Sequence, residues 1–191
     1  MTLGIAGILL CGGAARRFGA DKLMAGEVPL AVRAAGNLLA GAGHALAVIP
    51  LGRPALRAAL ESTGCEILES DRTTQGMGAS LAAAIESAAR HDGWIVALGD
   101  MPMVAPATIV ALRDALAAGA LVAAPFAPDG RRGHPVAFSA ALRAELLALE
   151  GDVGARAILE RHAGAMVRVE TADAGIFVDV DTPQDLAALG R

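Results

Sequence analysis

The sequence predicts an α/β fold, specifically a Rossmann-like three-layer α/β/α sandwich around a mostly parallel sheet. Short apolar runs typical of buried strands alternate along the chain with longer stretches of helical periodicity. Loops rich in glycine or acidic residues follow several of these runs, where open α/β sheets bind ligands. The 191 residues are enough for one well-buried domain and few for two, so we expect a single domain over residues 1–191.

The elements follow from apolar periodicity and from their end signals. Gly43 is a natural stop for the first helix, and prolines stand near the starts of later helices. We expect strands over residues 5–10, 45–49, 65–68, 94–98, 121–124 and 178–181, with another after residue 134. We expect helices over residues 30–42, from 54, 79–90, 106–116, from 151–156 and from 183.

Composition excludes several classes of protein. Hydrophobic residues make up 54% of the chain, but only four Phe, one Trp and no Tyr are present, so we expect an aliphatic core. A net charge of −4 argues against a nucleic-acid partner. No stretch has the length of a transmembrane helix without a charge or a glycine. Cys11 and Cys65 make no disulfide framework, which predicts a reduced, cytoplasmic protein.

The loop over residues 10–22 follows the first strand and joins glycines to cations. Gly12 and Gly13 let backbone N–H groups approach a ligand, and Arg17 and Lys22 add positive charge. Lys22 is the one lysine in a chain with fifteen arginines, which indicates that a compact ammonium is needed there. The pattern favours a polyphosphate ligand; the alternative is an ordinary solvated lysine. The spacing matches neither a P-loop nor a dinucleotide fingerprint.

A second glycine loop covers residues 73–81 and leads into a helix. Gly76 and Gly78 open the backbone, and Ser80 is able to cap the helix or to offer its hydroxyl to a ligand. An ordinary glycine-rich turn is the alternative.

Two aspartates follow strands and are candidate metal ligands. Asp100 comes directly after the strand at 94–98, and Asp181 precedes a strong helix start formed by Thr182, Pro183 and Asp185. The helix start explains those three residues but not Asp181. Two carboxylates with a cationic glycine loop suit Mg²⁺-assisted phosphoryl chemistry. The alternative for Asp100 is a turn beside a proline.

Three further residues are candidates for an acceptor substrate. His134 has no His or Cys partner at zinc spacing, and it either contacts substrate or caps a strand. Asp152 is expected near the N-terminus of the next helix. Arg156 either binds a phosphate or pairs with Asp152.

These motifs together resemble the molybdenum cofactor cytidylyl- and guanylyltransferases. Leu10, Gly13, Arg17, Phe18, Gly19 and Lys22 match the first loop of that family. Further elements similar to the family follow in order over nearly the whole chain: residues 76–81, 98–102, 133–138, 151–156 and 179–183.

The resemblance implies a nucleotide-diphospho-sugar transferase-like fold and transfer of a nucleoside monophosphate to molybdopterin. Leu10, Gly12, Gly13, Lys22, Gly76, Gly78 and Ser80 would bind the nucleotide. Asp100 and Asp181 would bind Mg²⁺, and Arg17, Lys22 and Asp100 would be catalytic. His134, Asp152 and Arg156 would face the acceptor. The resemblance also implies a molybdoenzyme or its maturation factor as the partner that receives the product.

The nucleotide and the acceptor stay open at the level of sequence. Gly12 stands where the cytidylyl pattern has alanine, whereas four later elements look like the cytidylyl branch: residues 76–81, 133–138, 151–156 and 179–183. We therefore expect CTP with some use of GTP. The alternatives are a guanylyltransferase, an enzyme for another phosphorylated acceptor, and a non-catalytic carrier of molybdenum cofactor. The metal carboxylates argue against the carrier.

Overall fold

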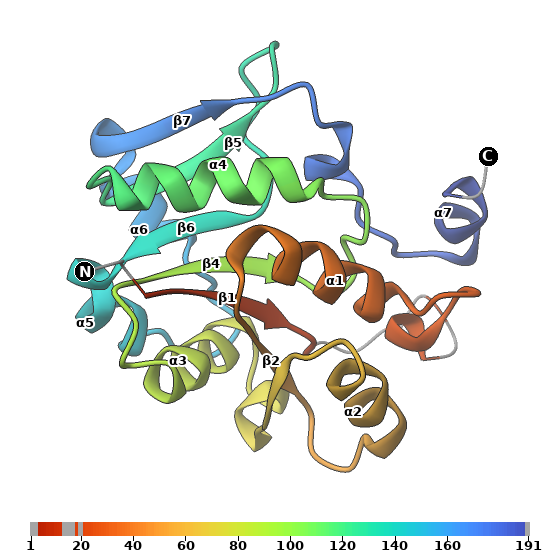
Figure 1. Cartoon of the computed structure of the whole chain (residues 1–191). Coiled ribbons are helices and arrows are strands. Elements are labelled where there is room, and N and C mark those ends of the chain that lie inside the picture. Colours follow the sequence, from red (N-terminus) through yellow and green to blue (C-terminus); the bar gives the residue numbers. More distant parts are fainter. Residues whose placement is uncertain (1–3, 13–17, 19–20, 190–191) are drawn as a thin grey trace.

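The computed structural model describes residues 4–12, 18 and 21–189, and its centre is a seven-stranded sheet (Figure 1). The strand order is β3-β2-β1-β4-β6-β5-β7. The strands are β1 (Ile5–Leu10), β2 (Ala45–Ile49), β3 (Glu66–Glu69), β4 (Gly93–Leu98), β5 (Val122–Phe126), β6 (Val136–Ser139) and β7 (Met166–Glu170).

The sheet is mostly parallel, as predicted, with β6 as its antiparallel strand. β6 runs antiparallel to both β4 and β5, whereas every other pairing is parallel. The chain reaches β6 from β5 through a short loop without a helix, and only an antiparallel partner is accessible by such a connection. Periodicity alone predicted the strand but not its direction.

Helices cover both faces of the sheet, which confirms the predicted three-layer sandwich. The α-helices are α1 (Leu30–Ala42), α2 (Pro54–Glu61), α3 (Met77–Ser87), α4 (Pro106–Ala117), α5 (Arg143–Leu147), α6 (Arg156–Arg161) and α7 (Pro183–Ala188). Short 3₁₀ helices are η1 (Lys22–Met24), η2 (Asp71–Thr74), η3 (Ala140–Leu142), η4 (Ala163–Ala165) and η5 (Ala174–Phe177). Gly43 ends α1 in the left-handed conformation at φ 83°, as its position predicted.

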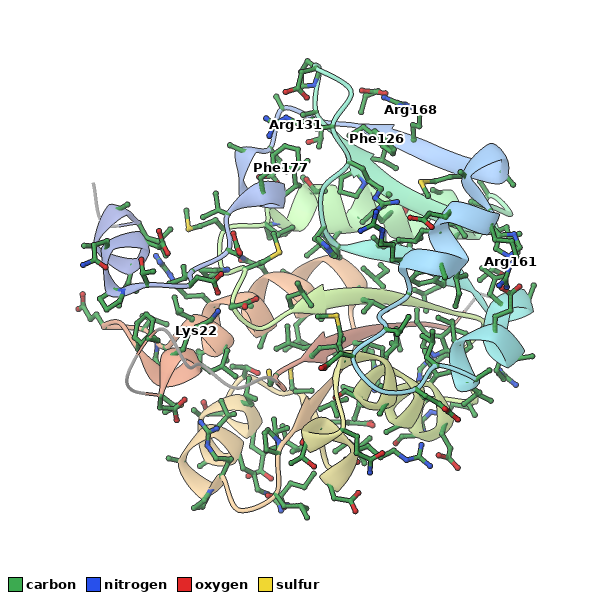
Figure 2. The ribbon with its side chains drawn as sticks, turned by 180° about the vertical axis from the view of Figure 1, so that it is seen from behind. Lys22, Phe126, Arg131, Arg161, Arg168 and Phe177 are labelled. Carbon is green, nitrogen blue, oxygen red and sulfur yellow. The ribbon has the colours of Figure 1, made fainter. Side chains whose placement is uncertain are left out.

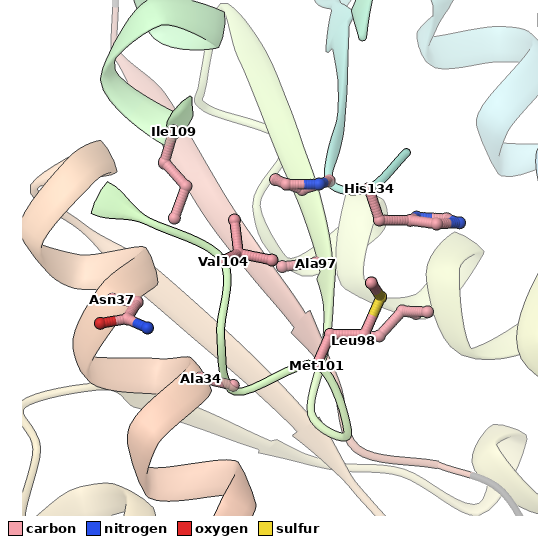
Figure 3. Close-up of a pocket in the computed structure, with 9 residues that line it drawn as sticks. Ala34, Asn37, Ala97, Leu98, Met101, Val104, Ile109 and His134 are labelled. Carbon is pink, nitrogen blue, oxygen red and sulfur yellow. The ribbon is translucent and has the colours of Figure 1, made fainter. Parts of the chain in front are cut away.

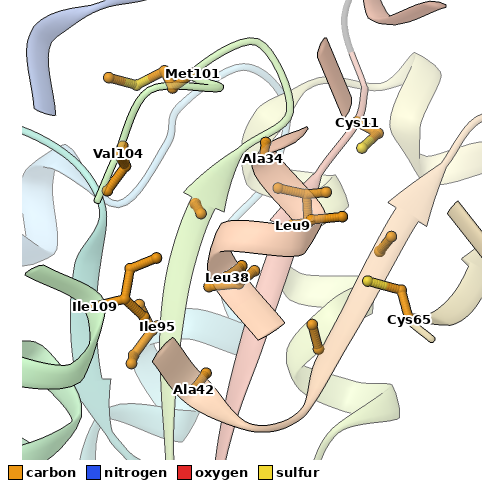
Figure 4. Packing of buried hydrophobic residues seen from close by; sticks show 14 of the residues in the cluster. Leu9, Cys11, Ala34, Leu38, Ala42, Cys65, Ile95, Met101, Val104 and Ile109 are labelled. Carbon is orange, nitrogen blue, oxygen red and sulfur yellow. The ribbon is translucent and has the colours of Figure 1, made fainter. Parts of the chain in front are cut away.

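Two hydrophobic clusters fill the space between the layers; the first is aliphatic, as expected, whereas the second includes the aromatic rings of Trp94, Phe126 and Phe138. On one face α1, α2 and α4 pack over alternate residues of β1 and β4, including Leu9 and Ile95 (Figure 4). On the other face α3, α5 and α6 pack over Ile8 and Val96. Alternation of side chains along each strand therefore feeds both cores. Cys11 and Cys65 are free, buried thiols of the first cluster, and burial raises the pKa of both.

Two expected elements differ from the structure. Residues 178–181 form no strand; this extended segment instead donates the Val180 N–H to the Asp100 carbonyl at 3.0 Å. The helix expected from residues 151–156 begins only at Arg156. Within the part of the chain that the structure describes, no helix is both long and apolar enough to cross a bilayer.

Candidate active site

The candidate site lies where the strand order reverses, at the carboxyl ends of β1 and β4. The chain proceeds from β1 to β2 and β3 on one side, and it adds β4 on the other. Loops that leave adjacent parallel strands in opposite directions open a crevice there. The Gly99 N–H donates to the Leu10 carbonyl at 3.0 Å, so the loop carrying Asp100 is joined to the end of β1.

Lys22, labelled in Figure 2, connects the two predicted metal ligands, Asp100 and Asp181. Its Nζ lies 2.8 Å from Asp100 Oδ2 and 2.7 Å from Asp181 Oδ1. The lysine is 9% exposed, and Asp181 is 159 residues away in the sequence. Sequence reasoning expected both carboxylates at one edge of the sheet, and the structure brings them to one cation.

The electrostatics of this cluster keep Lys22 charged. Burial alone lowers the pKa of a lysine. Hydrogen bonds and charge interactions with Asp100 and Asp181 outweigh burial here and raise the pKa of Lys22 above its ordinary value. The ammonium therefore stays protonated, and its two short contacts are charge-assisted hydrogen bonds.

Asp181 is held by the start of α7. The Thr182 side chain accepts from the Asp185 N–H, and Asp185 Oδ2 accepts from the Thr182 N–H at 2.7 Å, which completes the predicted capping box. Asp185 Oδ2 also accepts the N–H of Asp181 at 3.0 Å. The backbone of Asp181 is thus fixed relative to α7.

The second glycine loop packs against the loop at residues 150–154. Gly78 N–H donates to the Gly151 carbonyl at 2.8 Å, and a Cβ at Gly76 or Gly78 would collide with that neighbouring loop. Gly76 also adopts φ 126°, which side chains rarely tolerate. Asp152 lies against Gly76 at the start of α3, not at the start of its own helix as expected. The glycines therefore serve close packing of two loops.

Ser80 and Gly12 lie close together beside this packed region. Ser80 does not cap α3 from outside; its buried hydroxyl donates back to the Gly76 carbonyl at 2.8 Å. A Cβ at Gly12 would stand 3.4 Å from both Ser80 Oγ and Thr73 Cβ. The first and second glycine loops thus face one another across a single van der Waals contact distance.

His134 lines a small pocket between α1, α4 and the end of β4 (Figure 3). The other lining residues are Ala34, Asn37, Ala97, Leu98, Met101, Val104, Ile109 and Pro135. The side chain of His134 is exposed, although neighbouring atoms partly shield its ring and, with Arg132, lower its pKa. Its backbone N–H donates to the Ile176 carbonyl at 3.0 Å. His134 therefore reaches the surface beside the loop that carries Asp100.

Arg156 lies apart from the cluster around Lys22. Its Nε contacts Glu160 Oε1 at 2.8 Å, and 83% of its side chain is exposed. Of the two alternatives for Arg156, the structural pair with Asp152 is wrong, because Arg156 pairs with the i, i+4 carboxylate of Glu160 instead. Gly13 and Arg17 lie outside the described residues.

Two residues that sequence reasoning missed lie near this edge. Arg53 directly follows the loop after β2 and pairs with Asp21, the neighbour of Lys22. Asp173 contacts the N-terminus of α4. Arg53 could have been predicted, because ligand-binding loops follow parallel strands and Arg53 follows β2. Asp173 could not, because the neighbouring sequence indicates no more than a turn.

The side chains at the carboxyl ends of the strands limit which metal ion could bind there. Across the described residues no group of three or more His, Cys, Asp or Glu side chains converges on one point. Two carboxylates without nitrogen or sulfur ligands do not make a zinc centre. They suit a hard cation that keeps water and phosphate oxygens as its remaining ligands.

Fold and site together define a nucleotidyltransferase-type α/β protein. The MobA-like NTP transferase domain matches residues 7–183, so the chain belongs to this family and is an NTP-using nucleotidyltransferase. No curated protein sequence matches significantly.

Solved structures agree with this family. Rv0371c from Mycobacterium tuberculosis H37Rv is 28% identical with a TM-score of 0.83, over 99% of this chain and 98% of that chain. A complex of Rv0371c with manganese is 25% identical with a TM-score of 0.79, over 97% of each chain. A nucleotidyl transferase from Methanothermobacter, 20% identical with a TM-score of 0.80 over 97% and 95% of the two chains, shares the fold.

Proposed function

We propose that this protein transfers the nucleoside monophosphate of an NTP, preferentially CTP, to the terminal phosphate of molybdopterin and releases pyrophosphate, with Mg²⁺ as its metal. The observation that carries the proposal is the buried lysine held between two carboxylates at the reversal point of the sheet. Membership of the MobA-like NTP transferase family supports the use of an NTP.

The residues present fit a divalent cation. Asp100 and Asp181 direct one oxygen each at a single cationic position, and both oxygens are hard donors of the kind Mg²⁺ prefers. The manganese complex of Rv0371c supports a divalent metal in this family. When bound, Mg²⁺ would neutralise charge on the α-phosphate and on the departing pyrophosphate.

Lys22 and the metal require the same two carboxylates. The ammonium lies within 2.8 Å of both, which leaves no room for a second cation on the same pair of oxygens. Lys22 must therefore give up these two oxygens when a metal binds through them, and its flexible four-carbon side chain allows this movement. The phosphates of the incoming nucleotide offer the ammonium a new set of negative charges.

The remaining roles follow from charge and reach. Amides near Gly12 and Gly13 would cradle the triphosphate, and Arg17 and Lys22 would stabilise charge on the pyrophosphate as it leaves. An oxygen of the acceptor phosphate forms the new bond to the α-phosphorus. The bond from the α-phosphorus to its bridging oxygen breaks, and pyrophosphate takes the electron pair. Because the acceptor phosphate is already ionised, no general base is needed.

The acceptor side is supported by exposure and position rather than by contact with the metal ligands. His134 is exposed beside the loop of Asp100, and Arg156 presents an exposed guanidinium on α6. Asp152 lies against the second glycine loop, where Gly76, Gly78 and Ser80 would shape the pocket for base and ribose. His134, Asp152 and Arg156 stay proposals for molybdopterin contacts.

The test is pyrophosphate release with Mg²⁺, molybdopterin and, in separate reactions, CTP, GTP, ATP or UTP. We expect release with CTP, a slower reaction with GTP, and none when Asp181→Asn replaces the wild type. Release with GTP alone would identify a guanylyltransferase. Release only with another phosphorylated acceptor would refute molybdopterin, and tight molybdopterin binding without release would indicate a carrier.

A further inference from the structure

The segment from Asp173 to Asp181 connects the sheet to the second candidate metal ligand. We infer that Asp173 is a positioning residue for the metal centre: it ties this segment to the N-terminus of α4 and thereby sets where Asp181 stands relative to Asp100. This inference rests on the proposed function, in which the two aspartates bind the metal together.

Asp173 has three hydrogen-bond donors around its half-buried carboxylate. Oδ2 accepts from the Ala105 N–H and from the Thr108 hydroxyl, both at 2.8 Å, and Oδ1 accepts from the Gly175 N–H at 2.9 Å. Ala105 at the start of α4 provides no side-chain cap of its own. Asp173 therefore supplies the cap from 65 residues or more away in sequence, and its charge suits the positive end of the helix.

The loop between β4 and α4 contacts the same segment at a second place, near Asp100. The Val180 N–H donates to the Asp100 carbonyl at 3.0 Å. Between these points Gly175 packs so closely on the Met103 backbone that a Cβ there would collide with it. Residues 173–180 and residues 100–108 are thus clamped together at both ends and in the middle.

Two other contacts also bear on the position of Asp181. Lys22 Nζ contacts both Asp100 and Asp181, but the proposed function has it give up these oxygens when a metal binds. The His134 N–H donates to the Ile176 carbonyl at 3.0 Å, which is a backbone contact of the same segment.

The capping box fixes Asp181 to α7, which buries none of its residues and approaches the turn at Gly26 through Leu186. No strand pairing holds residues 178–181. The clamped segment therefore contributes to the placement of Asp181, and Asp173 provides its side-chain hydrogen bonds to α4.

The test measures Mn²⁺ affinity of the full chain by electron paramagnetic resonance, at a temperature where circular dichroism shows every variant folded. For Asp173→Ala we expect about tenfold weaker Mn²⁺ binding and a higher KM for Mg²⁺, with kcat largely restored at saturating Mg²⁺. Asp173→Asn retains one acceptor oxygen and should recover part of the affinity, and Thr108→Val should have a smaller effect.

Asp92→Ala is the matched control, because Asp92 accepts the Gly4 N–H at 3.1 Å at the opposite end of β4. It should leave Mn²⁺ affinity unchanged. Wild-type affinity in Asp173→Ala, or in folded Asp173→Asn should the alanine variant not fold, would overturn the positioning role. Wild-type affinity in Asp181→Asn would instead refute the metal assignment of the proposed function.

Discussion

The two ends of the parallel strands carry charged clusters of very different construction. At the carboxyl ends, Lys22 is enclosed between Asp100 and Asp181, with 11% of its side chain exposed. At the amino ends, His44 contacts Glu66 at 3.1 Å and Arg90 contacts Glu66 at 3.4 Å. There the side chains of Glu66 and Arg90 are 57% and 72% exposed.

This difference distinguishes a candidate functional site at the carboxyl ends from ordinary surface ion pairs at the amino ends. Exposed ion pairs contribute about 0–1 kcal/mol each and are screened by salt, so the amino-end cluster tolerates change. A buried ammonium with two carboxylates is costly to leave unpaired, and nothing in the sheet requires such a cluster for folding. We therefore expect substitutions at the carboxyl ends to alter chemistry and those at the amino ends to alter only stability.

The largest expected effect is that of removing a metal ligand. Asp100→Ala should reduce turnover to below about one-hundredth of wild type while the fold stays intact, because the residue leaves no core cavity. Asp181→Ala should do nearly the same. The measurement is pyrophosphate release together with a thermal melt, and wild-type-like release from either variant would remove the metal assignment.

Lys22→Arg tests whether charge alone is sufficient. The planar guanidinium is broader than an ammonium, and it would have to fit between carboxylates that now hold Nζ at 2.7 and 2.8 Å. We expect a loss of about tenfold or more in kcat/KM, equivalent to about 1.4 kcal/mol. Activity within about twofold of wild type would show that the reaction does not require a lysine at position 22.

Gly12→Ala should change nucleotide preference more than activity. The new methyl would stand 3.4 Å from Ser80 Oγ and Thr73 Cβ, an ordinary contact distance, so the variant should fold. One methyl group discriminates by about 1–3 kcal/mol, and we expect it to raise the preference for CTP over GTP. The comparison is kcat/KM for both nucleotides in both proteins. A wild type that uses GTP and ignores CTP would contradict this account.

The smallest effect concerns pH at the amino ends. Partial burial and the neighbouring His44, 5.0 Å away between ring centroids, lower the pKa of His91 against the weaker opposing effects of the Gly4 carbonyl and Glu66. The folded state therefore binds a proton less readily than the unfolded state, and stability should be lost as pH falls below about 6.5, the ordinary pKa of histidine, towards the lower pKa of the folded state. His91→Asn should flatten that slope in thermal melts at pH 7.5, 6.5 and 5.5. An unchanged slope would exclude His91 as the cause.

Most of the fold could be predicted from local patterns in the sequence. Apolar runs and end signals such as Gly43 or the Thr182–Asp185 capping box depend on neighbouring residues. They can therefore be recognised without knowing the tertiary structure. The direction of β6 could not be predicted, because periodicity does not report strand pairing. The start of α6 could not be predicted either, because residues 151–153, expected in its first turn, pack against the start of α3 instead.

For the site, sequence predicted which residues share an edge but not which ones touch. The rule for carboxyl ends holds for Asp100, which follows β4. It also predicted Asp181 at this edge, but for a wrong reason: residues 178–181 form no strand, and the hydrogen bond from the Val180 N–H to the Asp100 carbonyl brings them there. The rule did not predict that Lys22, assigned to phosphates, would contact both carboxylates. Asp173 was missed because its partners at Ala105 and Thr108 are distant in sequence. The roles of Gly13 and Arg17 stay predictions.

Mn²⁺ binding to Lys22→Met tests whether Lys22 and a metal ion compete for Asp100 and Asp181. Without the ammonium the two carboxylates are free, so Lys22→Met should bind Mn²⁺ more tightly than wild type when no nucleotide is present. Addition of CTP should strengthen Mn²⁺ binding by the wild type and narrow this difference. Equal or weaker Mn²⁺ binding by Lys22→Met without nucleotide would mean that Lys22 and the metal do not compete for these carboxylates.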